Sequence, residues 1–163
     1  MVRQLAELEA ALQQQVAEHR KLLGLVEAQY AAMRAMDLAA LDAAMNAQEA
    51  CRLRIATLEA KRRGVVQLIG RGAKVEGPVT LAKIAALFPQ RRDALFQLRD
   101  ELKSVAGTIA TRTKVSAKVA GAVLGHLNTV VRLLAGAVER AGVYTKDGIP
   151  QVSRRIGVME AVG

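Results

Sequence analysis

Few side chains in this sequence could carry out catalysis or hold a metal. The best candidates, His19, His126 and Cys51, lie far apart along the chain. A catalytic nucleophile needs a base beside it, and a metal site needs several ligands at a suitable spacing. Neither histidine has such a partner, and Cys51 is the single cysteine, so a disulfide or a zinc site has no second thiol. We therefore predict a non-enzymatic protein with no metal or cofactor, in which Cys51 is buried as a small apolar residue.

Phosphate and nucleic-acid binding find little support. The stretch Gly70-Arg-Gly72 is too short for a phosphate-binding loop and lacks the Lys-Ser/Thr continuation that holds phosphates and a metal. The arginine pairs at 62–63 and 91–92 are isolated, and no aromatic residues are interleaved with them for base stacking. We expect no nucleic-acid partner, and a basic coiled coil that binds nucleic acid is the least favoured alternative.

The residues best suited to a function lie near the end of the chain and suit binding. A segment without acidic residues runs from Leu102 to Val138, and its apolar residues recur every three or four positions. Such a stripe can bind an amphipathic helix of a partner. We predict a binding surface made of Leu124, Leu127, Val131, Leu134 and Val138.

A second candidate lies just beyond this segment, where Gly142 favours a helix end. An exposed tyrosine has a rigid apolar face with a polar tip, which suits Tyr144 to anchoring in a partner's pocket. Gly148 would let the chain turn away after it. We predict that Tyr144 and Gly148 form a docking site. The alternative is that the tyrosine ring folds back on the helix end as a hydrophobic cap.

Composition limits the fold that positions these residues. Of the 163 residues, 52% are apolar but only 2% aromatic, so the core must be thin. Alanine and leucine favour long helices that meet along narrow seams. We find no apolar run near the roughly 18 residues that span a bilayer, and the sequence opens on a charged amphipathic segment rather than a signal peptide. We expect a cytoplasmic protein without membrane insertion.

The net charge of +9 is unevenly distributed. Residues 1–60 carry 6 basic and 8 acidic side chains, whereas residues 61–142 carry 15 basic and 5 acidic ones. The second half therefore attracts nucleic acid, anionic lipid or an acidic protein surface, and charge alone does not choose among them.

Apolar periodicity predicts two helices in the first half. Residues 5–33 carry one stripe, on which His19 falls as a seam residue, and Asp37 can cap a new helix after a reversal at 35–37. The second helix should run over 38–69 and end in a loop over 70–79, where glycines and Pro78 interrupt the pattern. The predicted inward residues are Leu5, Leu8, Leu12, Val16, Leu23, Val26, Tyr30 and Met33, then Leu41, Met45, Cys51, Ile55, Leu58, Val65 and Ile69.

Thr80 can cap a short helix over 81–88, which Pro89 ends, and the last helix should begin near Gln90. Its apolar register shifts between Ile109 and Ala117, where small residues predict weak packing. Four glycines inside this helix lower its intrinsic stability, which suits a surface completed by a partner. Alternatively, these glycines let a neighbouring helix approach closely. They are Gly107, Gly121, Gly125 and Gly136.

The predicted fold is all-α, an elongated antiparallel bundle of three long helices and one short helix followed by an irregular C-terminal tail. Residues 1–142 would form the helical bundle domain and residues 143–163 a flexible tail.

Three stretches of the sequence resemble the FlgN-type flagellar export chaperones. Residues 22–41, Leu-Leu-Gly-Leu-Val-Glu-Ala-Gln-Tyr-Ala-Ala-Met-Arg-Ala-Met-Asp-Leu-Ala-Ala-Leu, resemble the family's leucine-rich first helix with an aspartate before a leucine. Gln48-Glu49 and Leu58-Glu-Ala-Lys-Arg-Arg63 resemble its second helix, and Tyr144-Thr-Lys-Asp-Gly148 resembles its Tyr-x-x-x-Gly signature. The resemblance covers nearly the whole chain.

This resemblance implies a cytosolic, non-enzymatic coiled-coil chaperone of bacterial flagellum biogenesis. It would hold the C-terminal segments of hook-associated (hook-filament junction) proteins and deliver them to the type III secretion export gate. The last helix would bind the client, and Tyr144 would dock on the gate protein FlhA. The alternative within this class is a chaperone for the filament cap or another type III substrate. An exposed seam would also serve a homo-oligomer.

Overall fold

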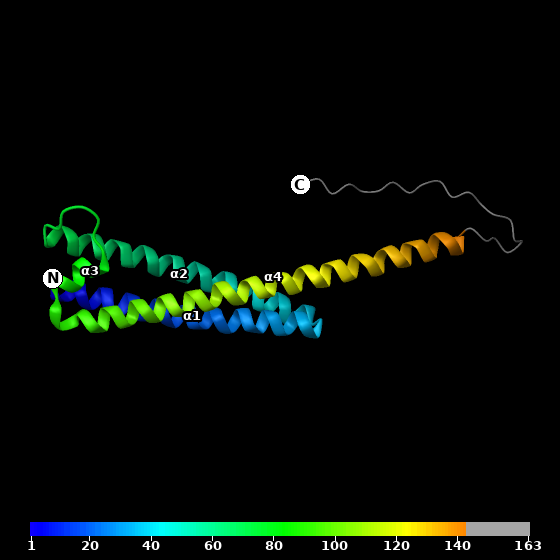
Figure 1. Ribbon diagram of the computed structural model, residues 1–163, viewed down its shortest axis with the longest axis horizontal. Helices are drawn as coiled ribbons and strands as arrows, with labels where there is room; N and C mark the ends of the chain where they lie inside the picture. The colour runs from blue at the N-terminus through cyan, green and yellow to red at the C-terminus, as the bar shows by residue number, and fades with distance from the viewer. Residues whose placement is uncertain (143–163) are drawn as a thin grey trace, which may run out of the picture. The chain divides into compact units, whose positions relative to one another are not determined.

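The computed structural model describes residues 1–142, with side chains as far as Ala137. This part of the chain is helical and contains no strand, which confirms the all-α prediction. Figure 1 shows its elements in chain order. They are α1 (Val2–Ala35), α2 (Leu38–Gly72), α3 (Leu81–Leu87), the 3-10 turn η1 (Pro89–Arg91) and α4 (Arg92–Gly142). The chain divides into two compact units, Met1–Ala120 and the part from Gly121 onward.

The reversal between α1 and α2 lies where the sequence predicts it. Met36 adopts the left-handed conformation, with φ 55°, and the Asp37 amide donates to the Ala32 carbonyl at 3.0 Å, which closes the end of α1. The Asp37 carboxylate then accepts a hydrogen bond from the Ala40 amide at 2.9 Å. This N-cap starts α2 antiparallel to α1, and the two helices form a closely packed hairpin.

The end of α2 corrects the sequence prediction. The helix continues to Gly72, so Gly70 and Gly72 are helical rather than part of the predicted loop. Gly70 is buried, and a Cβ atom there would collide with the side chain of Val79. The missing side chain therefore makes room for the returning loop instead of ending the helix. The helix end is closed instead at Lys74, which adopts the left-handed conformation with φ 51°, and the Val75 amide donates to the Gly70 carbonyl at 2.9 Å. Gly77, farther along the loop, also has a positive φ of 71°.

The short connection to α4 has the predicted cap. Thr80 Oγ1 accepts a hydrogen bond from the Lys83 amide at 3.3 Å and starts α3. The helix ends at Leu87, one residue before the predicted end, because Pro89 begins the 3-10 turn η1. Phe88 between them is buried. The α4 helix begins at Arg92, close to the predicted start.

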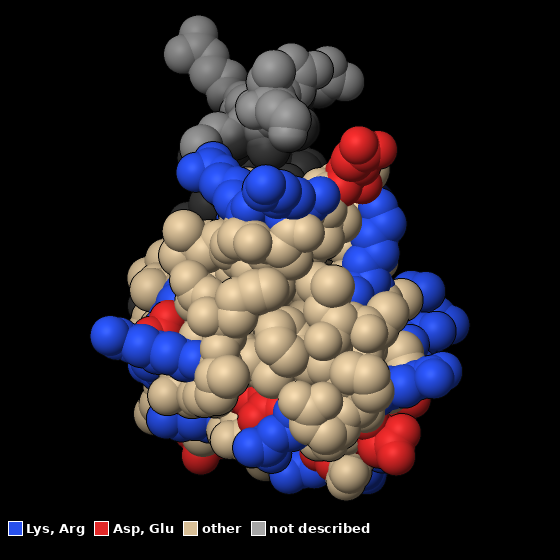
Figure 2. Space-filling model, turned by 90° about the vertical axis from the view of Figure 1, so that its left-hand side faces the viewer, with Lys and Arg blue, Asp and Glu red and all other residues tan. Residues whose placement is uncertain are grey.

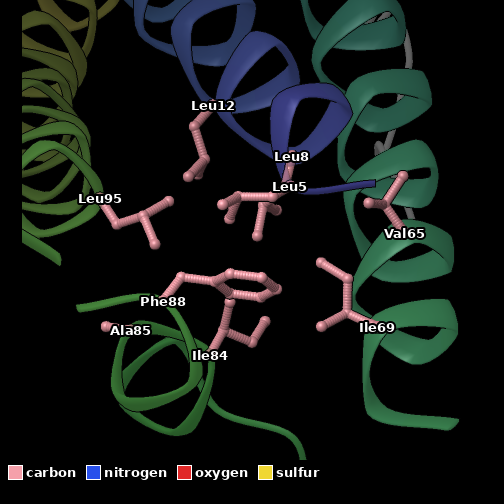
Figure 3. Packing of buried hydrophobic residues seen from close by; sticks show 9 residues of the cluster. All are labelled: Leu5, Leu8, Leu12, Val65, Ile69, Ile84, Ala85, Phe88 and Leu95. Atoms are coloured by element: carbon pink, nitrogen blue, oxygen red, sulfur yellow. The ribbon is translucent and has the colours of Figure 1, made fainter. Parts of the chain in front are cut away.

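The main core lies at the end of the Met1–Ala120 unit where α3 meets the three long helices. Figure 3 shows the Phe88 ring beside Ile84 and facing the leucines of α1. Leu8, Ile84 and Leu95 are completely buried there and come from three different helices. The cluster consists of Leu5, Leu8, Leu12, Val65, Ile69, Ile84, Ala85, Phe88 and Leu95.

A smaller core lies farther along the hairpin. Leu22, Val26, Cys51 and Ile55 are buried there, and Ile109 of α4 packs against them. Within the Met1–Ala120 unit, the backbone of α4 stays farther from α1 and α2 than these two helices are from each other. Side chains hold the first half of α4 and the preceding turn η1 to α1, including three ion pairs. They join Arg91 to Glu9 at 3.8 Å, Arg20 to Glu101 at 3.1 Å and Arg112 to Glu27 at 3.9 Å.

Several predicted core residues are confirmed, and others are not. Cys51 is fully buried, as predicted, and His19 is half-buried in α1. Met45 is 53% exposed, so its predicted inward position is wrong. Leu22 is buried where the sequence pattern favoured Leu23, which is half-buried. In both cases two apolar residues occupied neighbouring positions, and the approach of the other helices decides which one faces inward.

The predicted register of α4 is also wrong near its middle. The predicted shift places Thr113 and Ala117 on the seam, but both are exposed. Ser116 is buried instead. The seam therefore continues from Ile109 to Ser116 at heptad spacing without the predicted shift. Weak packing was nevertheless predicted here, and a cavity of about 80 Å³ borders Ser116, with α1 on its other side. The buried Ser116 hydroxyl has no hydrogen-bond partner among the described residues.

A fully buried glutamine supplies the first testable prediction. Gln15 is 0% exposed, and neither its amide nitrogen nor its oxygen has a hydrogen-bond partner among the described residues. Because an unpaired buried polar group destabilises the folded state, Gln15→Leu should raise the free energy of unfolding by about 1 kcal/mol or more. Denaturant titration measures this change.

The neighbouring Gln14 provides a matched control, since its side chain is exposed and Gln14→Leu should leave stability nearly unchanged. A lower unfolding midpoint for Gln15→Leu would contradict the prediction, because it would mean that the amide is hydrogen-bonded in the folded protein.

Candidate functional site

The part of α4 that begins at Gly121 exposes many large apolar side chains. Four of the five residues predicted as a binding surface are described in full, and all four are exposed. The fifth, Val138, lies in α4, but its side chain is outside the described part. Val130 and Leu133 are exposed as well, although the sequence pattern did not single them out. The exposed fractions are Leu124 67%, Leu127 47%, Val130 38%, Val131 61%, Leu133 64% and Leu134 61%.

We call these six residues the α4 apolar face. At about 100° per residue, they cover an arc of about 180° around the helix, from Leu133 at one edge to Leu124 at the other. His126 is exposed near the Leu133 edge. Asn128 and Arg132 project from the opposite side, together with the glycines. The α4 apolar face is therefore broader than the single stripe predicted from the sequence.

Electrostatics separate this face from the rest of the second half of the chain. The sequence has no acidic residue from Leu102 to Val138, but Arg132, the basic residue within 121–137, lies on the polar side of the helix. The face itself is thus nearly uncharged. Figure 2 shows another part of the surface, the end at the left of Figure 1, where Lys and Arg side chains predominate around a centre of uncharged residues.

The glycines of this part of α4 lie on its polar side. A Cβ atom at Gly121 or Gly125 would meet no described atom within 4 Å. The alternative that these glycines allow close helix contact therefore finds no support in the described part. What remains is their effect on the helix itself, which each glycine destabilises by about 1 kcal/mol relative to alanine.

This effect gives a second prediction. Gly121→Ala and Gly125→Ala should each stabilise this part of α4 by about 1 kcal/mol without altering the α4 apolar face. Amide hydrogen exchange over residues 121–137 should slow by about fivefold for each substitution. Gly24→Ala in α1, also with open space around it, should not change exchange in α4. Unchanged exchange in both α4 variants would show that the glycines do not weaken this helix.

A hydrogen-bonded group of three side chains, Glu18, Cys51 and Arg54, joins α1 to α2. The Cys51 thiol donates to the Glu18 carboxylate and backbone carbonyl, both at 3.3 Å, and Arg54 donates to the same carboxylate at 3.0 Å. Burial raises the pKa of Cys51, and the Arg54 hydrogen bond lowers the pKa of Glu18. A buried thiol with a raised pKa is unreactive, so this group stabilises the hairpin rather than performing chemistry.

No catalytic or metal site emerges from the described residues. Three or more His, Cys, Asp or Glu side chains do not come together there in a way that could hold a metal. His19 donates from Nδ1 to the Gln15 carbonyl at 2.7 Å, which is a contact within α1. The predicted docking residues Tyr144 and Gly148 lie outside the described residues.

One described helix is apolar enough to cross a membrane by length and composition. It spans Pro89–Ala137, reaches a mean hydropathy of 1.4 and has none of the hydrophobic window buried inside the protein. The sequence pattern predicted no membrane-spanning helix, because isolated polar residues interrupt the apolar residues of the window and leave no continuous apolar run. By itself such a helix is weak evidence for a membrane protein.

A helical hairpin with a fourth helix that exposes a broad apolar face is the architecture of a helical binding protein. The sequence comparisons specify which kind. A family model described as "FlgN protein" matches residues 1–151, so the chain belongs to the FlgN family. It is therefore a flagellar export chaperone, a helical protein that binds flagellar substrate proteins. No curated protein and no solved structure matched the chain.

Proposed function

We propose that this chaperone binds the C-terminal segments of hook-associated proteins in the cytoplasm and delivers them to the type III export gate. The observation that carries the proposal is the α4 apolar face, six large exposed side chains on one helix of a flagellar export chaperone. Contiguous apolar surface of this kind is costly in water unless a partner covers it.

The client site in this proposal is the predicted stripe Leu124, Leu127, Val131, Leu134 and Val138, which we call the client stripe. These residues recur at three and four positions, so an amphipathic client helix can lie along them with its own apolar residues interdigitating. Burying one leucine or valine side chain contributes roughly 1.5 kcal/mol or more. Several such residues together support an affinity that still allows release at the gate.

The low intrinsic stability of α4 suits client binding. Its glycines weaken the helix, and the backbone of its first half lies farther from α1 and α2 than these two helices lie from each other. A helix that completes its packing only with a client can adapt to different client segments, at the expense of the free energy needed to order it. Gly121 and Gly125 therefore fit a binding helix better than a structural one.

Docking on the gate protein FlhA is assigned in this proposal to Tyr144 and Gly148. Its support is the resemblance of residues 144–148 to the Tyr-x-x-x-Gly signature of the family, and the family match extends over both residues. The tyrosine ring would insert in a pocket of the gate protein while the client stripe keeps the client.

A client from the filament cap or another type III substrate remains the alternative within this class. Comparing the affinities of C-terminal peptides from these clients would decide between them.

Nucleic-acid binding is disfavoured by the ion pairs. Arg91 and Arg112 of the basic half face glutamates of α1 at 3.8 and 3.9 Å, so part of their charge is already neutralised within the chaperone.

The client stripe is tested by charge substitution. Leu127→Asp combined with Leu134→Asp should abolish capture of a hook-associated C-terminal peptide, since each carboxylate would be desolvated beneath the client. We expect at least a hundredfold loss of affinity by calorimetry. Because both side chains are exposed, circular dichroism should show an intact bundle.

The matched control is Leu53→Asp combined with Leu68→Asp. These leucines are 63% and 49% exposed on α2, and their substitution should leave capture unchanged. Unfolding of the Leu127/Leu134 variant would place those side chains in the chaperone's own core. Equal loss of capture in both double variants would remove the assignment to α4.

Gate docking is tested separately. Tyr144→Ala should leave unfolding and client affinity nearly unchanged while weakening binding to FlhA by about tenfold or more and slowing client secretion. A fall in melting temperature of several degrees with FlhA binding intact would identify Tyr144 as a packing residue instead.

A further inference from the structure

The α4 apolar face is wider than one client helix can cover. The client stripe occupies one side of the arc, and Val130 and Leu133 lie beside it toward the other edge, 38% and 64% exposed. At about 100° per residue the client stripe covers about 80° of the helix circumference, whereas the whole arc is about 180°. Half of the circumference of a helix is the part that a flat apolar medium would cover.

The polar side of the same segment disfavours a membrane span. Asn128 and Arg132 project opposite the α4 apolar face, and a spanning orientation would bury both in hydrocarbon. A helix that lies in the plane of the membrane surface keeps such residues in water and buries its apolar side among the lipid chains. The placement of the polar residues on one side of the helix favours the in-plane orientation.

Charge also favours a lipid surface. Within residues 121–137 the one charged side chain is the basic Arg132, so an anionic bilayer attracts this segment and nothing in it is repelled. The nearly uncharged polar side of residues 121–137 makes the buried apolar area the main source of binding. Anionic lipid then adds to binding without being essential.

From these observations we propose that the α4 apolar face of the empty chaperone binds a bilayer surface containing anionic lipid, with residues 121–137 lying in the membrane plane. This goes beyond client binding. Because the client stripe forms part of the surface, client and lipid would compete, and a client would release the chaperone from the membrane. Val130 and Leu133 contact lipid in this arrangement but lie outside the client stripe.

A tryptophan probe tests the orientation, since the chain contains no tryptophan. Leu133→Trp should shift its emission to shorter wavelength when vesicles of phosphatidylcholine with about 30% phosphatidylglycerol are added. Leu53→Trp is the matched control, because Leu53 is 63% exposed but lies on α2, and its emission should not shift. Equal shifts at both positions, or none at either, would overturn the proposal.

Vesicle flotation of the full chain tests the binding itself. Leu133→Ser should lower the vesicle-binding constant about tenfold, whereas Leu53→Ser should float like the unsubstituted chain. Capture of a hook-associated peptide should survive Leu133→Ser, so failure of the lipid proposal is distinguishable from failure of the client proposal. The proposal is overturned if the unsubstituted chain does not float or if Leu133→Ser floats equally well. It is also overturned if light scattering gives the mass of a dimer for the unsubstituted chain and of a monomer for Leu133→Ser, because a second copy of the chain would then cover the face.

Discussion

The packing of Leu8, Ile84 and Leu95 is the interaction on which the Met1–Ala120 unit depends. A helix as short as α3 is unstable alone, so it exists because Ile84 and its neighbours are buried between the long helices. Through Phe88 and the 3-10 turn that follows, this cluster fixes where α4 begins and which side of it faces α1. The register along the first half of α4 follows from that starting point.

The core thins with distance from this cluster. The second cluster receives only Ile109 from α4, and at Ser116 the helix contributes a small polar side chain beside a cavity of about 80 Å³. An alanine-rich and leucine-rich sequence with two phenylalanines lacks the large side chains needed to extend the core. From Gly121 onward the large apolar residues of α4 are exposed, which makes them available for binding.

Local signals allowed some features to be predicted from the sequence. The caps at Asp37 and Thr80 depend on one side chain and an amide three residues later, so they could be predicted without the fold. The end of α2 could not, because a side chain at Gly70 would collide with Val79 of the returning loop, and the sequence pattern does not show that this loop packs there.

The candidate site shows the same division. The client stripe follows from apolar periodicity, and its four described members are exposed. The width of the face was missed because Val130 and Leu133 each adjoin a residue of the client stripe, Val131 or Leu134, and a single stripe takes only one residue of each such pair. A wheel projection of residues 121–137 contains this signal, but whether such residues are buried depends on what packs against them, and the sequence pattern does not contain that information.

Photo-crosslinking in flagellated cells would test the central claim most directly. A photoreactive amino acid would replace Leu127 on α4 or, as the matched position, Leu53 on α2. If the client stripe holds hook-associated proteins, the probe at Leu127 will form a covalent adduct with one of them, identified by mass spectrometry, and the probe at Leu53 will not. Adducts with hook-associated proteins from Leu53 but not from Leu127 would contradict the account.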